Sequence, residues 1–295
     1  MIGFLADVEF LWGFQARAIG LSRTPPSFYY PPPTVFLGAL AEVIAKENNI
    51  GESLGKFIIN ELSRNLLAIG FRPINCIPVK YEDLNRIIMI RCVGKKIESP
   101  LPTKPYGSFD SPARGKTIFS SLNNEPPRVR WFLVFENREL DVRDERLRSK
   151  IDKITLNENY FWKIHRLGSK ESKISVIDVT ILDNIQIINK GYIITGYAFP
   201  LKSVKDGEEK TRKWEYEVYV NPFKGDIYTV KRGKRGTIEE SGILDKYYDL
   251  RSLLIFKVPI ICLSRKLPEY MGTLNDNWKA YSISYGNKRE VILGR

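Results

Sequence analysis

The sequence is poor in the residues that most catalytic and metal sites require. Of its 295 residues one is a histidine, His165, and three are cysteines, Cys76, Cys92 and Cys262. No two of the cysteines have metal-ligand spacing, and their odd number and wide separation are typical of small core residues in a reducing cytoplasm. We therefore expect a cytoplasmic protein with no metal and no cofactor.

The common catalytic motifs are missing as well. There is no phosphate-binding GxxxxGK[ST], no GxGxxG after a strand, no HExxH and no GxSxG. His165 lies in "FWKIHRLG", beside Arg166, near the end of a predicted helix. Such a histidine typically contacts backbone carbonyls or solvent, although a role as a catalytic acid or base stays open at this stage.

Long hydrophobic runs are also absent. The most apolar windows, residues 35–45 and 253–263, are interrupted by charged residues, and both are shorter than the roughly 20 residues that span a bilayer. The first residues, "MIGFLADVEF", lack the basic lead and the cleavage site of a signal peptide. We expect no contact with a membrane.

Positive charge is abundant. Lys and Arg total 46 against 34 Asp and Glu, which gives a formal charge of +12, while a hydrophobic fraction of 43% supports a real core. The excess of positive charge favours an anionic partner such as a nucleic acid.

Apolar spacing predicts alternating strands and helices in the first part of the chain. Phe36, Leu40 and Ile44 recur at helical spacing after Pro33, so a helix is predicted from about Thr34. The other predicted elements are a strand at residues 2–10, a helix at 52–69, strands at 87–93 and 129–136, a largely helical charged stretch at 143–166 and a strand at 173–182.

This order predicts an α+β fold with a ferredoxin-like or RRM-like sheet and an insertion. The insertion is the irregular stretch at about residues 94–127, and the first domain is predicted to span residues 1–184. From residue 185 to 295 the alternation is typical of a mainly antiparallel β domain. In "KWEYEVYVNPFKGDIYTVKR", the segment "NPFKGD" is predicted to be the turn of a hairpin.

Three short segments combine glycine with cations: "FDSPARGKTIFSS", "HRLGSKES" and "VKRGKRG". Glycine lets a backbone approach a phosphate closely, and Lys or Arg neutralises its charge. One such segment alone is more often a solvated turn, but three of them in a chain of this charge favour a nucleic acid. The candidate contacts are Arg114, Gly115, Lys116, Arg166, Gly168, Ser169 and Lys170.

The stretch "TPPSFYYPPPTVFLGAL" adds a stiff proline segment before the first helix. It would fix the free N–H groups of the helix start where phosphates can bind, with Arg17 and Arg23 just upstream. The alternative is a rigid turn that only starts a core helix. Nearby aromatic residues either stack on bases or pack under the prolines, and we expect at least two of them to pack; they are Phe14, Phe28, Tyr29 and Tyr30.

The segments "LWGFQA", "PPPTVFLGALA", "ARGKTIFSS" and "RLGSKESKISV", in this order, resemble the Cas5 family of CRISPR-associated proteins, and most closely its archaeal type I-A branch. The resemblance covers about residues 1–183 and is strongest at "PPPTVFLGALA" and "RLGSKES". This family belongs to the RAMP superfamily, which implies an RRM-like domain with a glycine-rich loop.

The resemblance implies a non-catalytic subunit of a Cascade surveillance complex in antiviral defence. Such a subunit holds the 5′ handle of the crRNA, contacts the backbone subunit and helps to seat the large subunit, with target DNA nearby. The insertion at residues 94–127 would be the thumb-like segment. Gly168, Ser169 and Lys170 would contact phosphate.

Two alternatives remain. In another subtype the family member cuts precursor RNA without a metal, using a Tyr, Lys and His cluster. This chain has a single histidine with no recognisable Tyr and Lys beside it, and in type I-A a separate endonuclease does the cutting, so we expect no catalysis. The other alternative is a structural connector whose basic faces meet acidic proteins.

Overall fold

The computed structural model describes residues 1–16, 27–83, 91–93, 96–98, 114–142, 153–210, 213–232, 238–260, 268–286 and 288–295. This part of the chain has a few helices and mostly antiparallel strands, so the predicted mixture of α and β structure is confirmed. None of its helices is long and apolar enough to cross a membrane.

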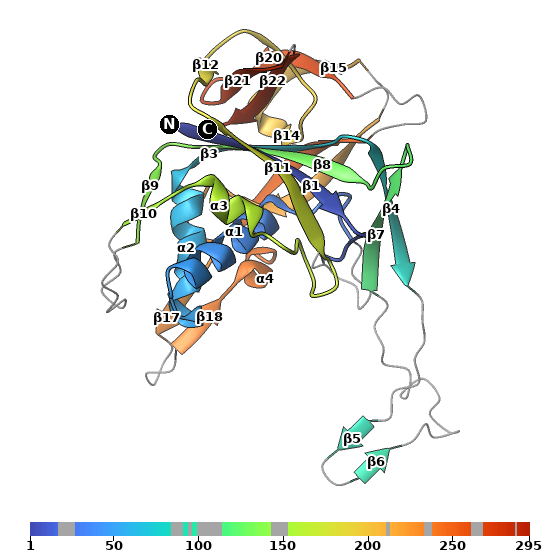
Figure 1. The fold of residues 1–295 in the computed structure, drawn as a ribbon, viewed down its shortest axis with the longest axis vertical. Helices are drawn as coiled ribbons and strands as arrows, with labels where there is room; N and C mark the ends of the chain where they lie inside the picture. The colour runs from blue at the N-terminus through green and yellow to red at the C-terminus, as the bar shows by residue number, and fades with distance from the viewer. Residues whose placement is uncertain are drawn as a thin grey trace.

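A seven-stranded sheet forms the centre of the molecule (Figure 1). In spatial order its strands are β11 (Ile174–Leu182), β1 (Ile2–Phe10), β8 (Arg128–Phe135), β3 (Leu66–Pro73), β22 (Lys288–Gly294), β21 (Lys279–Tyr285) and β12 (Gln186–Ile188). Every neighbouring pair is antiparallel. The strands predicted at residues 2–10, 129–136 and 173–182 are all in this sheet.

Helices cover one face of this sheet: α1 (Pro33–Glu47), α2 (Glu52–Asn65) and the short α3 (Glu158–Trp162). Stacked rings join the two layers. The ring centroids of Phe4 and Phe161 are 4.4 Å apart, and those of Trp131 and Phe36 are 4.7 Å apart. The start of α1 is close to the predicted position, with Pro32 as the N-cap residue and Pro33 in the first turn.

The prediction that the second helix continues to Ile69 is wrong, because α2 ends at Asn65 and β3 begins at Leu66. Hydrogen bonds of 2.8 Å join Asn65 O to Glu136 N and Asn65 Oδ1 to Asn137 N, which hold the helix end beside the end of β8. The residues that follow, Leu66–Pro73, are buried in the sheet except for the partly buried Leu67. Apolar spacing alone does not separate such a buried strand from a buried helix.

The prediction of a largely helical stretch at residues 143–166 is also wrong where the structure describes it; residues 143–152 lie outside the described part. Lys153–Thr155 is a strand, β10, paired with β9 (Glu139–Asp141), and only α3 is helical. Ile154 and Leu156 are both buried. This alternation has the period of a strand.

A second, three-stranded sheet has the order β2 (Gly13–Phe14), β7 (Arg114–Ser121), β4 (Cys76–Asp83). Strand β7 lies in the predicted insertion, so this part is a regular strand that pairs with β4 along its whole length. Strands β5 (Arg91–Val93) and β6 (Lys96–Glu98) form a further pair. The remainder of residues 84–113 lies outside the described part.

The C-terminal part adds small sheets of antiparallel strands. One has the order β13 (Tyr192–Thr195), β20 (Tyr270–Leu274), β15 (Val204–Glu209). Another has the order β14 (Phe199–Pro200), β19 (Leu253–Pro259), β16 (Trp214–Val220). A third consists of the pair β17 (Thr229–Arg232) and β18 (Ile238–Ser241). Short helical turns lie at η2 (Leu201–Ser203), α4 (Ile243–Lys246) and η3 (Leu250–Ser252).

The hairpin predicted around "NPFKGD" is wrong, because β16 pairs with β19 and β17 pairs with β18. The segment after β16 is bound to α2 instead. Ser63 Oγ donates to Pro222 O at 2.5 Å, and Asn60 forms two hydrogen bonds with the backbone of Tyr228, at 2.6 and 2.8 Å. These contacts carry the chain away from β16.

Strands from both sides of residue 184 share the central sheet. The predicted domain division lies between β11 and β12, and both of these strands belong to that sheet. The C-terminal part also covers the second face of the central sheet, where Leu5 and Phe132 cluster with Tyr197, Tyr281 and Ile292. Because both faces are covered, β1 is apolar nearly throughout rather than alternating.

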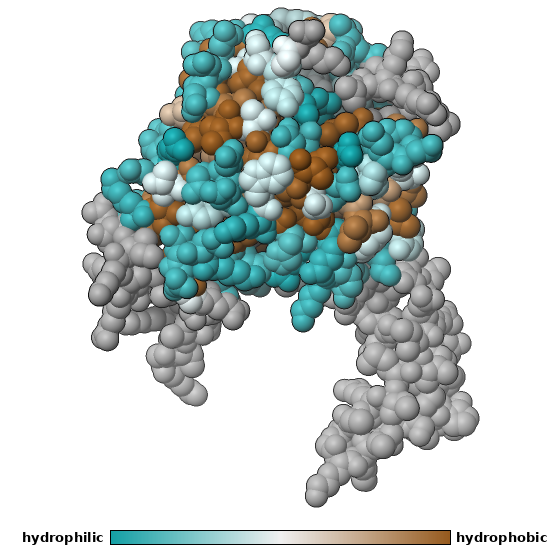
Figure 2. All heavy atoms as spheres, viewed as in Figure 1, coloured by the Kyte–Doolittle hydropathy of each residue, from teal (hydrophilic) through white to brown (hydrophobic). Residues whose placement is uncertain are grey.

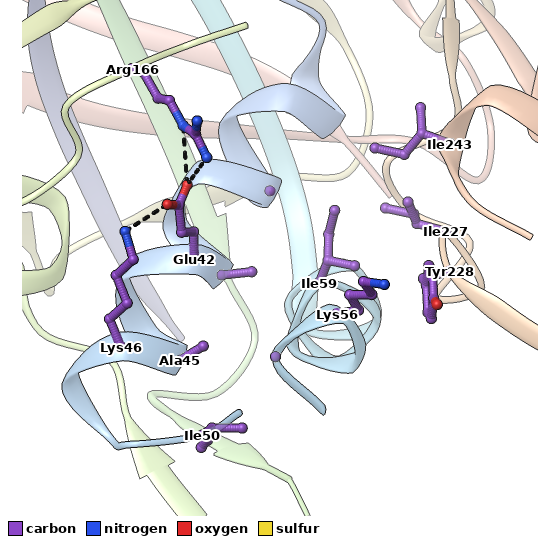
Figure 3. A pocket seen from close by; sticks show the side chains of 13 residues that line it. Glu42, Ala45, Lys46, Ile50, Lys56, Ile59, Arg166, Ile227, Tyr228 and Ile243 are labelled. Atoms are coloured by element: carbon purple, nitrogen blue, oxygen red, sulfur yellow. Dashed lines mark hydrogen bonds and ion pairs between the residues drawn. The ribbon is translucent and has the colours of Figure 1, made fainter. Parts of the chain in front are cut away.

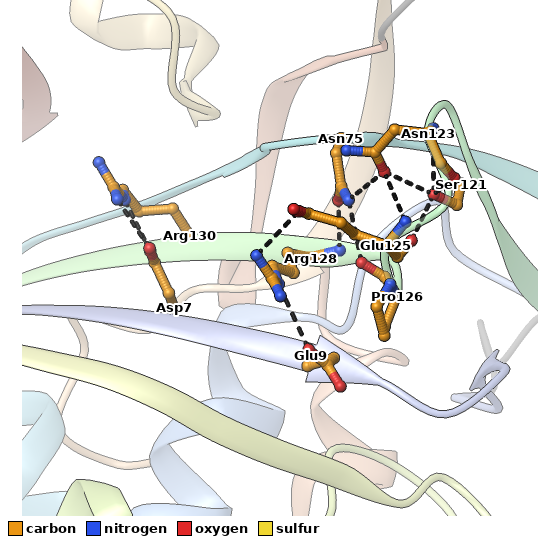
Figure 4. A network of polar contacts seen from close by, with 9 residues as sticks. All are labelled: Asp7, Glu9, Asn75, Ser121, Asn123, Glu125, Pro126, Arg128 and Arg130. Carbon is orange, nitrogen blue, oxygen red and sulfur yellow. Dashed lines mark hydrogen bonds and ion pairs between the residues drawn. The ribbon is translucent and has the colours of Figure 1, made fainter.

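A row of charged side chains crosses this second face (Figure 4). Arg130 on β8 donates hydrogen bonds of 2.6 and 2.7 Å to Asp7 on β1, and Arg72 on β3 pairs with Glu290 on β22 at 2.8 Å. Burial alone would lower the pKa of Arg130, but the hydrogen bonds and the charge of Asp7 raise it above its usual range. The guanidinium therefore stays charged and satisfies the buried carboxylate.

The turn between β7 and β8 is fixed by a neighbouring polar network (Figure 4). Asn75 donates to Asn123 Oδ1 at 2.9 Å and accepts the N–H of Arg128 at 2.8 Å. The Arg128 side chain contacts Glu9 and Glu125 at 3.3 and 3.1 Å. This network joins the base of the β4–β7 hairpin to the central sheet.

Hydrophobic residues reach the surface among the strands of the face shown in Figure 2, while the area over the helices is mostly hydrophilic. Val79 on β4 and Ile118 on β7 lie opposite each other and are 47% and 40% exposed. The β4–β7 hairpin therefore has an apolar outer face.

We expect Arg130→Met to lower the free energy of unfolding by roughly 3–5 kcal/mol, because it leaves Asp7 buried without a cation. Urea denaturation measures the change. The control is Lys205→Met, which breaks an exposed pair with Asp276 and should have far less effect. Equal effects of the two substitutions would contradict the assigned role of Arg130.

Candidate nucleic-acid interface

The segment 167–172, here called the glycine turn, connects α3 to β11. Gly168 has a φ of +123°, and a Cβ at this position would lie 2.7 Å from Gln15 O. Ser169 N donates to Gln15 O at 2.9 Å, and Gln15 N donates to Ser172 Oγ at 2.9 Å. Only glycine combines this conformation with so close an approach, and the turn is thereby held against the residues that follow β2.

Those residues also contact the β4–β7 hairpin. Gly13 and Phe14 pair with Ile118 and Thr117 of β7, and a Cβ on Gly13 would lie 2.0 Å from Thr117 O. Residues 13–15 thus run from the hairpin directly to the glycine turn. Two predicted phosphate-binding segments that are far apart in sequence are linked through this short strand.

The glycine turn and α1 enclose a hollow of about 350 Å³. Four candidate residues line it, Arg166, Gly168, Ser169 and Lys170, together with Val35, Gly38, Ala39 and Glu42 of α1. Lys170 is exposed and Ser169 half-buried. The hollow has the size of a small ligand group and has the Ser169 hydroxyl and the Lys170 ammonium as donors among its lining residues.

Glu42 of α1 sets the charge on one side of the hollow (Figure 3). It accepts hydrogen bonds from Arg166 at 2.8 Å and from Lys46 at 2.7 Å. Burial alone would raise the pKa of Glu42, but these hydrogen bonds outweigh it and hold the pKa below its usual value. The charge of Arg166 is therefore partly neutralised. Lys170, in the glycine turn, is the more exposed of these two cations.

The proline segment is anchored in the core. Phe14, Phe28 and Tyr30 are each at most 4% exposed, and Tyr30 donates its hydroxyl proton to Pro259 O at 2.6 Å. The expectation that at least two of the four aromatic residues pack is confirmed. Tyr29 alone among them is half-buried.

Tyr29 belongs to a cluster around a buried carboxylate. Glu217 Oε1 accepts the N–H of Tyr29 at 2.7 Å and pairs with Lys80 at 3.1 Å, and Glu217 also accepts the hydroxyl proton of Tyr219. The Lys80 ammonium lies 3.4 Å from the centre of the Tyr29 ring. Burial raises the pKa of Glu217 in spite of these partners, and burial with two nearby glutamates raises the pKa of Tyr29.

The other candidate residues are placed differently. Gly115 and Lys116 lie within β7, as does the backbone of Arg114, so these residues are in a paired strand and not in a glycine loop. Their positions pair with Asp83, Glu82 and Tyr81 of β4. Arg17, Arg23 and residues 233–237 of the third basic segment lie outside the described part of the chain, as does the Arg114 side chain.

His165 is exposed, and its carbonyl accepts the N–H of Ile174 at 3.1 Å. No group of three or more residues that could hold a metal ion occurs among the residues that the structure describes. Sequence reasoning missed Gln15, Glu42 and Glu217, which position the site from segments distant in sequence. No spacing signal connects them to the residues that they contact.

Gly168→Ala should lower the free energy of unfolding by roughly 1–3 kcal/mol, because it adds a clash with Gln15 O to an unfavourable backbone conformation. Gly191→Ala is a matched control, since Gly191 has a φ of +119° with open space around its Cβ position. Urea denaturation of both variants isolates the clash. If the two lose the same stability, the close approach to Gln15 has no energetic weight.

Glu217→Gln tests the buried carboxylate through its pH dependence. Burial raises the pKa of Glu217 in the folded state above its ordinary value of 4.5. As pH rises, the unfolded chain therefore loses the carboxyl proton before the folded chain does. The stability of the wild type relative to the variant should be greatest below pH 4.5 and fall toward the raised pKa. Urea denaturation across this range should show that fall, and a rising difference would contradict the assignment.

No protein-family model matches the sequence. The chain is 26% identical over 202 residues to CRISPR-associated protein Cas5 2 of Saccharolobus solfataricus, covering 67% of this chain and 68% of the relative. Its fold is similar, with a TM-score of 0.68 and 41% identity, to the crystal structure of a CRISPR protein from Archaeoglobus fulgidus, covering 100% of this chain and 99% of that chain. The chain belongs to the Cas5 family of CRISPR-associated proteins.

Proposed function

We propose that the chain is a non-catalytic subunit of a type I, and specifically type I-A, Cascade complex that binds the 5′ handle of crRNA. The observation that carries the proposal is the glycine turn, which is held by Gln15 beside the start of α1 and presents Ser169 and Lys170 at a hollow. A hydroxyl and an exposed ammonium are donors that commonly bind phosphate.

The strand order supports a ferredoxin-like, RRM-like RAMP domain. The first four strands of the sheet by sequence, β1, β3, β8 and β11, take the spatial order fourth, first, third, second, with antiparallel neighbours. Helices follow the first strand and precede the fourth. This is the arrangement of a split βαβ fold, in which the glycine turn leads into the fourth strand.

In this proposal the β4–β7 hairpin is the thumb-like segment. Its apolar outer face, with Val79 and Ile118 exposed, suits contact with another protein subunit better than contact with RNA phosphates. We infer that this hairpin meets the backbone subunit, while the large subunit contacts the chain elsewhere.

The absence of catalysis is part of the proposal, and the Tyr29–Lys80–Glu217 cluster supports it. The raised pKa of Tyr29 disfavours a phenolate that could act as a base at neutral pH. The carboxylate of Glu217 is buried and satisfied by three donors. These contacts fit a structural joint between the proline segment, β4 and β16.

Lys170→Ala should weaken binding of handle RNA about tenfold at moderate salt, because one charge-assisted phosphate contact is lost. The slope of log affinity against log salt should fall by roughly 0.7. Fluorescence anisotropy with a labelled handle RNA measures both quantities, and Lys205→Ala, on β15, is the control.

The same samples, incubated in EDTA and run on a denaturing gel, report cleavage. We expect the RNA to remain intact. Specific cleavage that is lost in His165→Ala would replace this proposal with a metal-independent endoribonuclease, and unchanged affinity of Lys170→Ala would remove the glycine turn from the RNA site.

A further inference from the structure

A second cavity lies beside the glycine turn, between α1, α2 and the segments around β17 and α4 (Figure 3). Its volume is about 690 Å³, which is within the range of ligand-binding clefts. Ala41 and Ala45 of α1 and Ile59 of α2 form its floor, and Ile227 and Ile243 form the opposite wall. We call it the helix groove.

Contacts between α2 and Tyr228 fix the width of the groove. Asn60 of α2 bonds the backbone N–H and carbonyl of Tyr228 at 2.8 and 2.6 Å, and the ring of Phe57 meets the Tyr228 ring edge-on at 5.5 Å. The wall is therefore fixed to α2 at a set distance. At the other end the helices are close, since a Cβ on Gly55 would lie 2.8 Å from Ala45 Cβ.

The rim of the groove is positively charged. Among the described lining residues, the charged ones are Lys46, Lys56, Arg166 and one carboxylate, Glu42. Because Lys46 and Arg166 share that carboxylate, these three side chains keep one net positive charge at the rim. An occupant with an apolar side and acidic flanks would match both floor and rim.

We propose that the helix groove binds an acidic amphipathic α-helix of a neighbouring protein subunit, a proposal that rests on the function proposed above. The groove walls are built largely from α-helices, whose backbone groups are already hydrogen-bonded. An extended peptide would find few backbone partners there, whereas a helix satisfies its own backbone and presents apolar anchors one turn apart.

RNA fits this groove less well. Bases bind by stacking on aromatic faces, and the aromatic ring among the described lining residues, Tyr228, already contacts Lys56 at 5.5 Å and Phe57. The floor offers only methyl and methylene groups from Ala41, Ala45 and Ile59, which do not replace the water around a phosphate. The apolar floor therefore favours a protein side chain.

The first test uses the full chain and a labelled peptide of about 18 residues, long enough to form a helix. One peptide has leucines along one face and glutamates beside them, a second has lysines in place of the glutamates, and a third is a scrambled acidic sequence. We expect only the first to bind in fluorescence anisotropy. Equal binding of all three, or no binding, overturns the proposal.

The charge-reversed variant Lys46→Glu with Lys56→Glu should weaken binding of the acidic peptide by at least about tenfold. Lys202→Glu with Lys205→Glu is the matched control, because it changes the net charge equally at η2 and β15, away from the groove. Equal losses in the two double variants would show a non-specific charge effect and reject the groove.

A second test is made in the particle that copurifies with the chain. A photoreactive benzoylphenylalanine replaces Lys46, and the expected product is a protein adduct within an acidic amphipathic helix. An RNA adduct, or none, overturns the proposal. Handle-RNA binding is measured separately: if the wild-type chain binds no RNA while the groove still selects the acidic peptide, the proposed function fails and the groove assignment stands.

Discussion

The backbone of Gln15 is the point on which the arrangement of the candidate site depends. Its carbonyl accepts the N–H of Ser169 and its N–H donates to Ser172, while its neighbours Gly13 and Phe14 pair with β7. Three segments from distant parts of the sequence meet along one short strand. The two glycines at this junction make the close approach possible, because any side chain there would collide with a carbonyl oxygen.

Burial of both faces of the central sheet limits where the proposed RNA site can lie. In many RRM domains the open face of the sheet stacks bases on aromatic side chains. Here the chain's own C-terminal part covers that face, with Arg72 and Arg130 neutralised by carboxylates inside it. For the RNA binding that we propose, this leaves the helical side and its edges, where the glycine turn and the start of α1 lie.

The sequence predicts the elements with simple periodicity and misses those determined by distant contacts. The start of α1 and strands β1, β8 and β11 follow from prolines and apolar runs. The end of α2 at Asn65 depends on bonds to residues after β8, which no local pattern reveals. For the site, Gly168 and Lys170 follow from composition, whereas Gln15 is unremarkable in sequence and acts through its backbone.

The pairing of β3 with β22 has a consequence for how the chain folds. Gly294 lies opposite Ala68, so close that a Cβ would be 2.0 Å from Leu67 O, and the N–H of Arg295 bonds that same carbonyl. During synthesis β3 emerges long before its partner, so a buried, apolar strand waits with an open edge. Translation rather than folding therefore sets when this pairing can form, and until β22 has been synthesised that edge of β3 stays open to other chains.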